Sequence, residues 1–166
     1  EACHEVGVPK GVVNFVAGPG AELGEGLVNA KPLKAISFTG SCDAGNWLHA
    51  CASKRRLRIQ LEMGGKNPTI VLADADLDNA VGNTINAAFA STGQKCTATS
   101  RVIVEDSIYE SFVAALVEKT RALTVGNGLE AGIDIGPVID QAQLDTNIHY
   151  VEIADQEGAK LELGGN

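Results

Sequence analysis

Two short segments of this 166-residue sequence carry side chains suited to covalent chemistry. Residues 61–68 read Leu-Glu-Met-Gly-Gly-Lys-Asn-Pro and place the carboxylate of Glu62 beside paired glycines. Residues 89–96 end in Gly-Gln-Lys-Cys and place the thiol of Cys96 after a turn. A thiol attacks a carbonyl carbon as its thiolate, and a base elsewhere in the fold completes such a reaction. Cys96 is therefore the candidate nucleophile and Glu62 the candidate base.

The residues around Cys96 favour an anionic sulfur. We expect a helix to start at Thr97, where free N–H groups would stabilise a thiolate, and Lys95 adds a nearby positive charge. The alternative for a lone cysteine is a buried, inert thiol, and the alternative for Glu62 is a surface carboxylate that ends a strand. We expect the remaining cysteines, Cys3, Cys42 and Cys51, to be such buried, inert thiols.

Together the two segments resemble the active-site signatures of the aldehyde dehydrogenase family. The resemblance includes Leu61 before the glutamate, Gly-Gly-Lys-Asn-Pro after it, and Phe89 seven positions before the cysteine. It also includes the 34 positions that separate Glu62 from Cys96. The sequence of residues 91–101 most resembles family members that act on 2-oxoglutarate semialdehyde. Residues 132–138 also resemble the catalytic domain of the family.

The resemblance implies a two-stage reaction on a small aldehyde. Cys96 attacks the carbonyl to form a thiohemiacetal, hydride transfer to a nicotinamide cofactor leaves a thioester, and Glu62 activates the water that hydrolyses it. The backbone N–H of Cys96 is one candidate donor to the oxyanion. Relatives that pass the acyl group to coenzyme A commonly lack this glutamate, so Glu62 favours a free acid product.

Glycine-rich strand ends form the candidate cofactor site. Residues 18–24 follow a predicted strand and open a predicted helix, which suits a diphosphate but also suits a plain turn. Ser41 and Asp43 could bind a phosphate or simply cap the next helix. By resemblance, contact with NAD or NADP falls to Gly18, Gly20, Gly24, Phe38, Thr39, Gly40, Ser41, Gly45 and Met63. The sequence does not choose between the two cofactors, and no metal is expected.

Alternating β-branched runs and helical patterns predict an α/β fold with parallel sheets and flanking helices. Strands are expected at 12–16, 35–38, 58–61, 69–72, 101–104 and 160–163. Helices are expected at 21–29, 44–54, 77–91, 108–123 and 141–156, with a loop at 126–137. In the helix at 108–123, one stripe should be buried, consisting of Val113, Leu116, Val117 and Leu123.

The expected organisation is partial. Residues 1–63 would form the latter part of a dinucleotide-binding domain, and residues 64–166 the first part of a cysteine-bearing catalytic domain. Family members are roughly three times this length by resemblance, so the chain looks like the middle third of an enzyme. We expect it to be inactive towards its aldehyde substrate by itself and to belong to a homo-oligomer when full length.

Composition excludes several partners. A net charge of −8 and a pI near 4.8 argue against a nucleic-acid or anionic-membrane surface. No apolar run approaches the ~20 residues that cross a bilayer, and no signal-peptide pattern opens the chain. The four cysteines lack CxxC or metal-ligand spacing, which favours reduced thiols in a cytoplasmic protein.

Two alternatives to an aldehyde dehydrogenase stay open. The chain could be a truncated, non-catalytic remnant of the same fold that acts as an interaction module. It could also be a reductase of activated acyl groups, which would use Cys96 but not Glu62. Lys54, Arg55, Arg56 and Arg58 form a basic cluster. The preferred interpretation is that these cations complement the dipole at a helix C-terminus, and binding of an anionic partner is the less favoured alternative.

Overall fold

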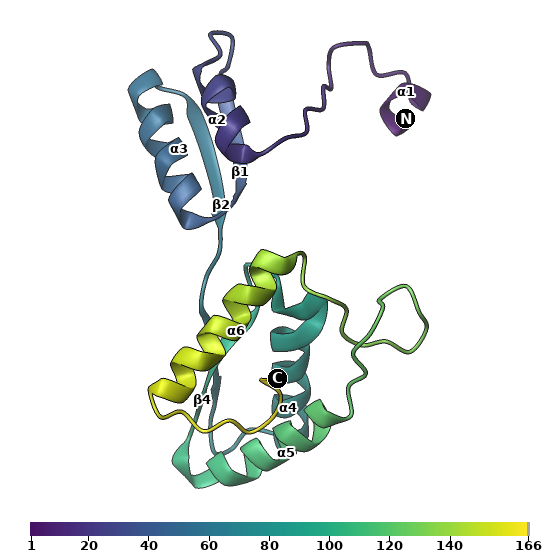
Figure 1. Ribbon diagram of the computed structural model, residues 1–166, viewed down its shortest axis with the longest axis vertical. Coiled ribbons are helices and arrows are strands. Elements are labelled where there is room, and N and C mark those ends of the chain that lie inside the picture. Colours follow the sequence, from purple (N-terminus) through teal and green to yellow (C-terminus); the bar gives the residue numbers. More distant parts are fainter. Residues whose placement is uncertain (166) are drawn as a thin grey trace. The chain divides into compact units, whose positions relative to one another are not determined.

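A computed structural model describes residues 1–165, which divide into two compact units, Glu1–Met63 and the residues from Gly64 onward (Figure 1). The boundary lies between the same two residues as the predicted one. The cofactor role of the first unit and the catalytic role of the second stay predictions. Each unit is described by itself below.

The first unit is built on two parallel strands. It contains α1 (Ala2–Glu5), α2 (Gly20–Asn29), β1 (Ala35–Gly40), α3 (Cys42–Arg55) and β2 (Arg58–Met63). Ala35 pairs with Arg58 at one end of the sheet and Gly40 with Met63 at the other. Exposure alternates along both strands, with Ile36, Phe38, Ile59, Leu61 and Met63 half-buried. One face of this sheet is therefore packed, and α3 contacts both strands.

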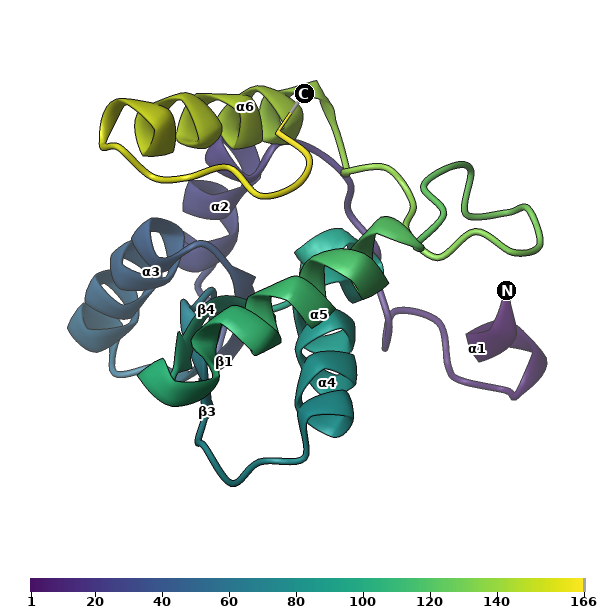
Figure 2. The same cartoon turned by 90° about the horizontal axis from the view of Figure 1, so that it is seen from below.

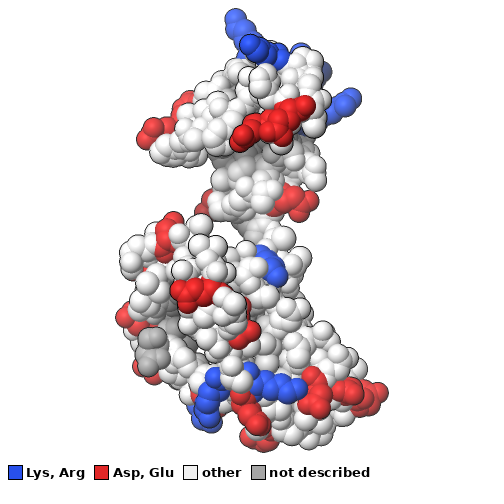
Figure 3. All heavy atoms as spheres, turned by 90° about the vertical axis from the view of Figure 1, so that its right-hand side faces the viewer, with Lys and Arg blue, Asp and Glu red and all other residues white. Residues whose placement is uncertain are grey.

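Most of the basic cluster, Lys54, Arg55 and Arg56, lies at the carboxyl end of α3, where positive charge complements the helix dipole. In Figure 3, Lys and Arg side chains gather at one end of the first unit. Lys54 and Arg55 lie in the last turn of α3, and Arg56 ends that helix with a left-handed backbone. The guanidinium of Arg55 donates hydrogen bonds to the carbonyls of Val28 and Ala30 at the end of α2. This cation neutralises the carboxyl end of a second helix, as the structural interpretation of the cluster predicts.

The second unit places two helices over a second parallel sheet. It contains β3 (Asn67–Val71), α4 (Leu77–Phe89), the 3₁₀ turn η1 (Ala90–Gly93), β4 (Thr99–Val104), the 3₁₀ turn η2 (Asp106–Ile108), α5 (Tyr109–Arg121) and α6 (Gln141–Gln156). Strands β3 and β4 pair in parallel, and α4 and α5 lie side by side in both views (Figures 1 and 2). The core is formed by Val71, Val81 and Phe112. The predicted stripe on α5 is only half-buried, and the fully buried Phe112 was not predicted.

Two predicted strands are wrong. Residues 12–16 form no strand and are exposed, with Phe15 90% exposed. Residues 160–163 form none either and lead into Gly164 and Gly165, both with positive φ. Both runs have strand-like composition, but a strand forms only where a neighbouring edge pairs with its backbone, and within residues 1–165 neither run has one.

The predicted helix from Thr97 is also wrong. Cys96 and Thr97 form a turn in which the N–H of Ala98 donates to the carbonyl of Lys95, and β4 begins at Thr99. The hydroxyls of Thr69 and Thr99 are 2.9 Å apart across the sheet. Because β4 pairs with β3 from Thr99 onward, these residues belong to a strand and cannot form a helix.

Along residues 1–165, no helix combines the length and apolar character that crossing a membrane requires.

Candidate active site

Five of the nine predicted cofactor residues lie at the carboxyl ends of the two strands of the first unit. Phe38, Thr39 and Gly40 end β1, and Met63 ends β2 directly opposite Gly40. Ser41 follows β1 and begins α3, where its hydroxyl accepts a hydrogen bond from the N–H of Ala44 at 3.2 Å. Ser41 is thus a helix cap, whereas Asp43 lies in the first turn. The carboxyl edge of a parallel sheet is where open α/β folds bind ligands.

Gly45 is required for α3 to approach this edge. It is buried, and a Cβ at this position would collide with Sδ of Met63 and lie 3.6 Å from Cε1 of Phe38. The absence of a side chain therefore lets the first turn of α3 rest on two predicted cofactor residues.

We expect Gly45→Ala to lower the free energy of unfolding by about 1–3 kcal/mol, because the added methyl group forces Met63 or the helix to move. Urea unfolding measures this change. Gly82→Ala is the matched control, since it lies within α4 with nothing within 4 Å of the added Cβ. It should be stabilising by about 0.5–1 kcal/mol. Equal effects at the two glycines would contradict close packing at Gly45.

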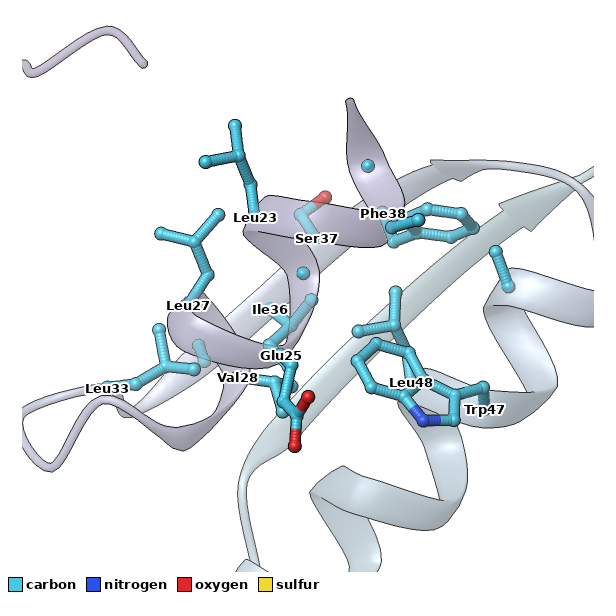
Figure 4. Close-up of a pocket in the computed structure, with 15 residues that line it drawn as sticks. Leu23, Glu25, Leu27, Val28, Leu33, Ile36, Ser37, Phe38, Trp47 and Leu48 are labelled. Carbon is cyan, nitrogen blue, oxygen red and sulfur yellow. The ribbon is translucent and has the colours of Figure 1, made fainter. Parts of the chain in front are cut away.

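Gly20 and Gly24 border an apolar pocket. Gly20 begins α2, and a Cβ on Gly24 would lie 3.5 Å from Cζ3 of Trp47. Between α2, β1 and α3 lies a pocket of about 900 Å³ (Figure 4). Its lining includes Leu23, Leu27, Leu33, Ile36, Phe38, Trp47 and Leu48. Trp47 and these leucines were not predicted as site residues, although Leu23 and Leu27 recur at helical spacing on α2.

Glu62 lies on the other face of the same edge. It pairs with Thr39 and immediately precedes Met63, which contacts α3, so successive side chains place its carboxylate on the face away from that helix. The side chain is exposed, and Oε1 accepts from Nε2 of Gln60 at 3.5 Å. A weakly held carboxylate in water can accept a proton from a water molecule.

Cys96 lies in an exposed turn of the second unit, between η1 and β4. Its carbonyl accepts a hydrogen bond of 2.7 Å from the side-chain amide of Asn67 at the start of β3. Within residues 1–165 its N–H has no hydrogen-bond partner, so that donor is available to an incoming oxygen. The turn supplies this donor in place of the predicted helix start.

The residues before Cys96 have an unusual backbone. Ser91, Thr92 and Gly93 have φ values of 55°, 60° and 68°, in the left-handed region. A β-branched residue rarely adopts this conformation, and each non-glycine costs about 1–2 kcal/mol. The side chains of Thr92 and Gln94 make hydrogen bonds that join this stretch to the loop before α6. The hydroxyl of Thr92 donates to the carbonyl of Gly136 at 3.0 Å, and the N–H of Ile139 donates to Oε1 of Gln94 at 3.0 Å.

The other cysteines correct one expectation. Cys3 and Cys42 are exposed and Cys51 is half-buried, so the prediction of three buried thiols is wrong. Cys42 opens α3 directly after the cap residue Ser41, and this first position of the helix is exposed. Over the described part of the chain, no three His, Cys, Asp or Glu side chains are grouped as metal ligands would be.

Comparison with known proteins establishes the family. The family model described as "Aldehyde dehydrogenase family" matches residues 1–166, and the chain belongs to that family. The chain is 48% identical over 165 residues to an alpha-ketoglutaric semialdehyde dehydrogenase of Bacillus subtilis, covering 99% of this chain and 34% of that protein. It is 47% identical to a betaine aldehyde dehydrogenase of the same organism, over 98% of this chain and 33% of the relative.

Solved structures agree on the fold. The betaine aldehyde dehydrogenase of Staphylococcus aureus, solved in complex with NAD+, superposes with a TM-score of 0.93 at 37% identity. The match covers 98% of this chain and 32% of that one. The predicted aldehyde dehydrogenase-like α/β fold with parallel sheets and flanking helices is thus confirmed. The chain spans about a third of the length of the relatives it matches.

Proposed function

We propose that this chain carries the nucleophile, the base and much of the cofactor site of an NAD(P)-dependent enzyme that oxidises an aldehyde to a carboxylic acid. The observation that carries the proposal is the exposed Cys96, whose carbonyl accepts a hydrogen bond from Asn67 while its N–H has no partner among the described residues 1–165. A thiol beside an unpaired backbone donor is suited to attack on a carbonyl group.

The proposed chemistry uses two residues of the chain in turn. The thiolate of Cys96 bonds to the aldehyde carbon, and the carbonyl oxygen becomes an oxyanion that the N–H of Cys96 stabilises. When bound, NAD or NADP supplies the hydride acceptor that converts the thiohemiacetal to a thioester. Glu62 then takes a proton from water, the resulting hydroxide adds to the thioester carbon, and the acid leaves as the Cys96 thiolate is regenerated.

The residues of the first unit fit a dinucleotide. The apolar pocket beside Trp47 suits a flat heteroaromatic ring, and the start of α3 after Gly40 and Ser41 suits a phosphate. Gly18, Gly20, Gly24, Phe38, Thr39, Gly45 and Met63 complete the proposed set. The NAD+ complex of the Staphylococcus aureus enzyme supports this assignment.

Trp47 provides the test of cofactor binding, because it is the one tryptophan of the sequence and lines the pocket. We expect NAD or NADP to quench its fluorescence saturably. Nicotinamide mononucleotide, which lacks the adenosine half, is the control and should cause no saturable change. Identical behaviour with all three compounds would contradict the proposed site, and the better of the two dinucleotides identifies the cofactor.

We propose 2-oxoglutarate semialdehyde as the substrate, supported by the 48% identical relative and by similarly named proteins of Haloferax volcanii and Saccharolobus solfataricus. The full-length protein is proposed to be a homo-oligomer.

The 166-residue chain alone should form no reduced cofactor with semialdehydes, because it spans about a third of the length of its relatives. Absorbance at the wavelength of the reduced nicotinamide checks this expectation, and a signal that Cys96→Ser removes would contradict it.

A non-catalytic remnant that acts as an interaction module is the second candidate. The exposed side chains of Ile70 and Ile103, paired across β3 and β4, favour it because they leave an apolar face on the sheet. Thiol titration separates the two: an activated Cys96 reacts faster than Cys3, whereas a remnant has no reason to activate it.

A further inference from the structure

Hydrogen bonds connect the turn that contains Cys96 to residues 136–139 of the second unit. The hydroxyl of Thr92 donates to the carbonyls of Gly136 and Pro137 at 3.0 and 3.4 Å. Two positions later, Oε1 of Gln94 accepts from the N–H of Ile139 at 3.0 Å. These hydrogen bonds join residues more than forty positions apart, and the two side chains that make them lie within four residues of Cys96.

These hydrogen bonds act on a backbone conformation, at Ser91 and Thr92, that is unfavourable by itself. Ser91 and Thr92 are both left-handed, and a β-branched threonine favours negative φ. A residue keeps such a conformation only where surrounding contacts over-determine it. Thr92 therefore both adopts the unfavourable conformation and makes hydrogen bonds that can maintain it.

We propose that Thr92 is a positioning residue for Cys96. Its hydroxyl, assisted by Gln94, ties the nucleophile turn to residues 136–139 and so fixes the direction in which the thiol and the N–H of Cys96 point. Asn67 holds the same turn from the other side, through the carbonyl of Cys96. This role rests on the proposed function of Cys96 as the nucleophile.

The test measures how fast iodoacetamide alkylates Cys96 relative to Cys3, an exposed thiol of the first unit, in the 166-residue chain. Mass spectrometry of the two peptides gives the ratio. Thr92→Val removes the hydroxyl and keeps the β-branched shape, whereas Thr92→Ser keeps the hydroxyl. Thr146→Val is the matched control, because it removes a hydroxyl that donates to the carbonyl of Ala142 within α6.

We expect a Cys96-to-Cys3 ratio well above one in the unmodified chain. Thr92→Val should lower it about three- to tenfold, the range that one intramolecular hydrogen bond contributes. Thr92→Ser and Thr146→Val should leave it within about twofold, which is less than one such hydrogen bond typically contributes. Circular dichroism establishes that each variant is folded. Gln94→Met, which removes the second link, should lower the ratio in the same way and decides the matter if Thr92→Val does not fold.

The contrary outcomes are distinguishable. A high ratio in the unmodified chain that neither Thr92→Val nor Gln94→Met lowers would overturn the positioning role and leave the proposed function standing. A ratio near one in the unmodified, folded chain would overturn the proposed nucleophile, and the positioning role with it.

Discussion

Replacing Cys96 with serine is expected to slow the acylation of the chain by p-nitrophenyl acetate by about 10³-fold or more. A thiol is a few per cent ionised at neutral pH, whereas a serine hydroxyl without an adjacent base is not. This ester needs no cofactor, so it isolates the nucleophilic step. The measurement is the initial release of p-nitrophenolate, which should reach one equivalent per chain before Cys96 is replaced.

Cys42→Ser is the matched control, since Cys42 is also exposed and also lies at a turn into a regular element. It should leave the initial release unchanged. If Cys42→Ser removed as much of the release as Cys96→Ser, general thiol reactivity would account for the reaction, and Cys96 would have no special role.

Replacing Glu62 with glutamine should preserve the first equivalent of p-nitrophenolate and slow the subsequent turnover about 10²- to 10⁴-fold, the usual contribution of a general base. Glutamine keeps the size of the side chain and its place opposite Thr39 but takes no proton from water. The acyl group should therefore accumulate on Cys96. Steady-state release of p-nitrophenolate, followed after the first equivalent, measures the effect.

Glu25→Gln provides the control, because Glu25 is another carboxylate of the first unit and lines the apolar pocket. An unchanged steady state in Glu62→Gln would favour the reading of Glu62 as a surface carboxylate, and with it a reductase of activated acyl groups. Loss of the first equivalent would instead assign Glu62 a role in activating the thiol.

Much of the fold could be predicted from periodicity and motifs. Helical patterning predicts the helix at 141–156, and short β-branched runs predict the strands that begin at Ala35 and Arg58. Residues far apart in sequence, such as Phe38 and Met63, gather because parallel strands end at one edge of a sheet. The motifs around Glu62 and Cys96 together indicate the aldehyde dehydrogenase family, and the family match confirms it.

The remainder depends on tertiary contacts that no local pattern contains. Residues 12–16 have the composition of a strand but no edge to pair with. Thr97 does not begin a helix because β4 pairs with β3 back to Thr99. The left-handed Thr92 was unpredictable for the same reason, since its partner carbonyls at Gly136 and Pro137 lie more than forty positions away.

The most direct test of the central claim is to locate the acyl group itself. The chain would be mixed with p-nitrophenyl acetate, quenched in acid after the first equivalent of p-nitrophenolate, digested and analysed by mass spectrometry. We predict that the acetyl group lies on the peptide that contains Cys96, with Cys3 and Cys42 essentially unmodified. Acetyl groups shared among the exposed cysteines would contradict the account, because they would show that exposure alone decides which thiol reacts.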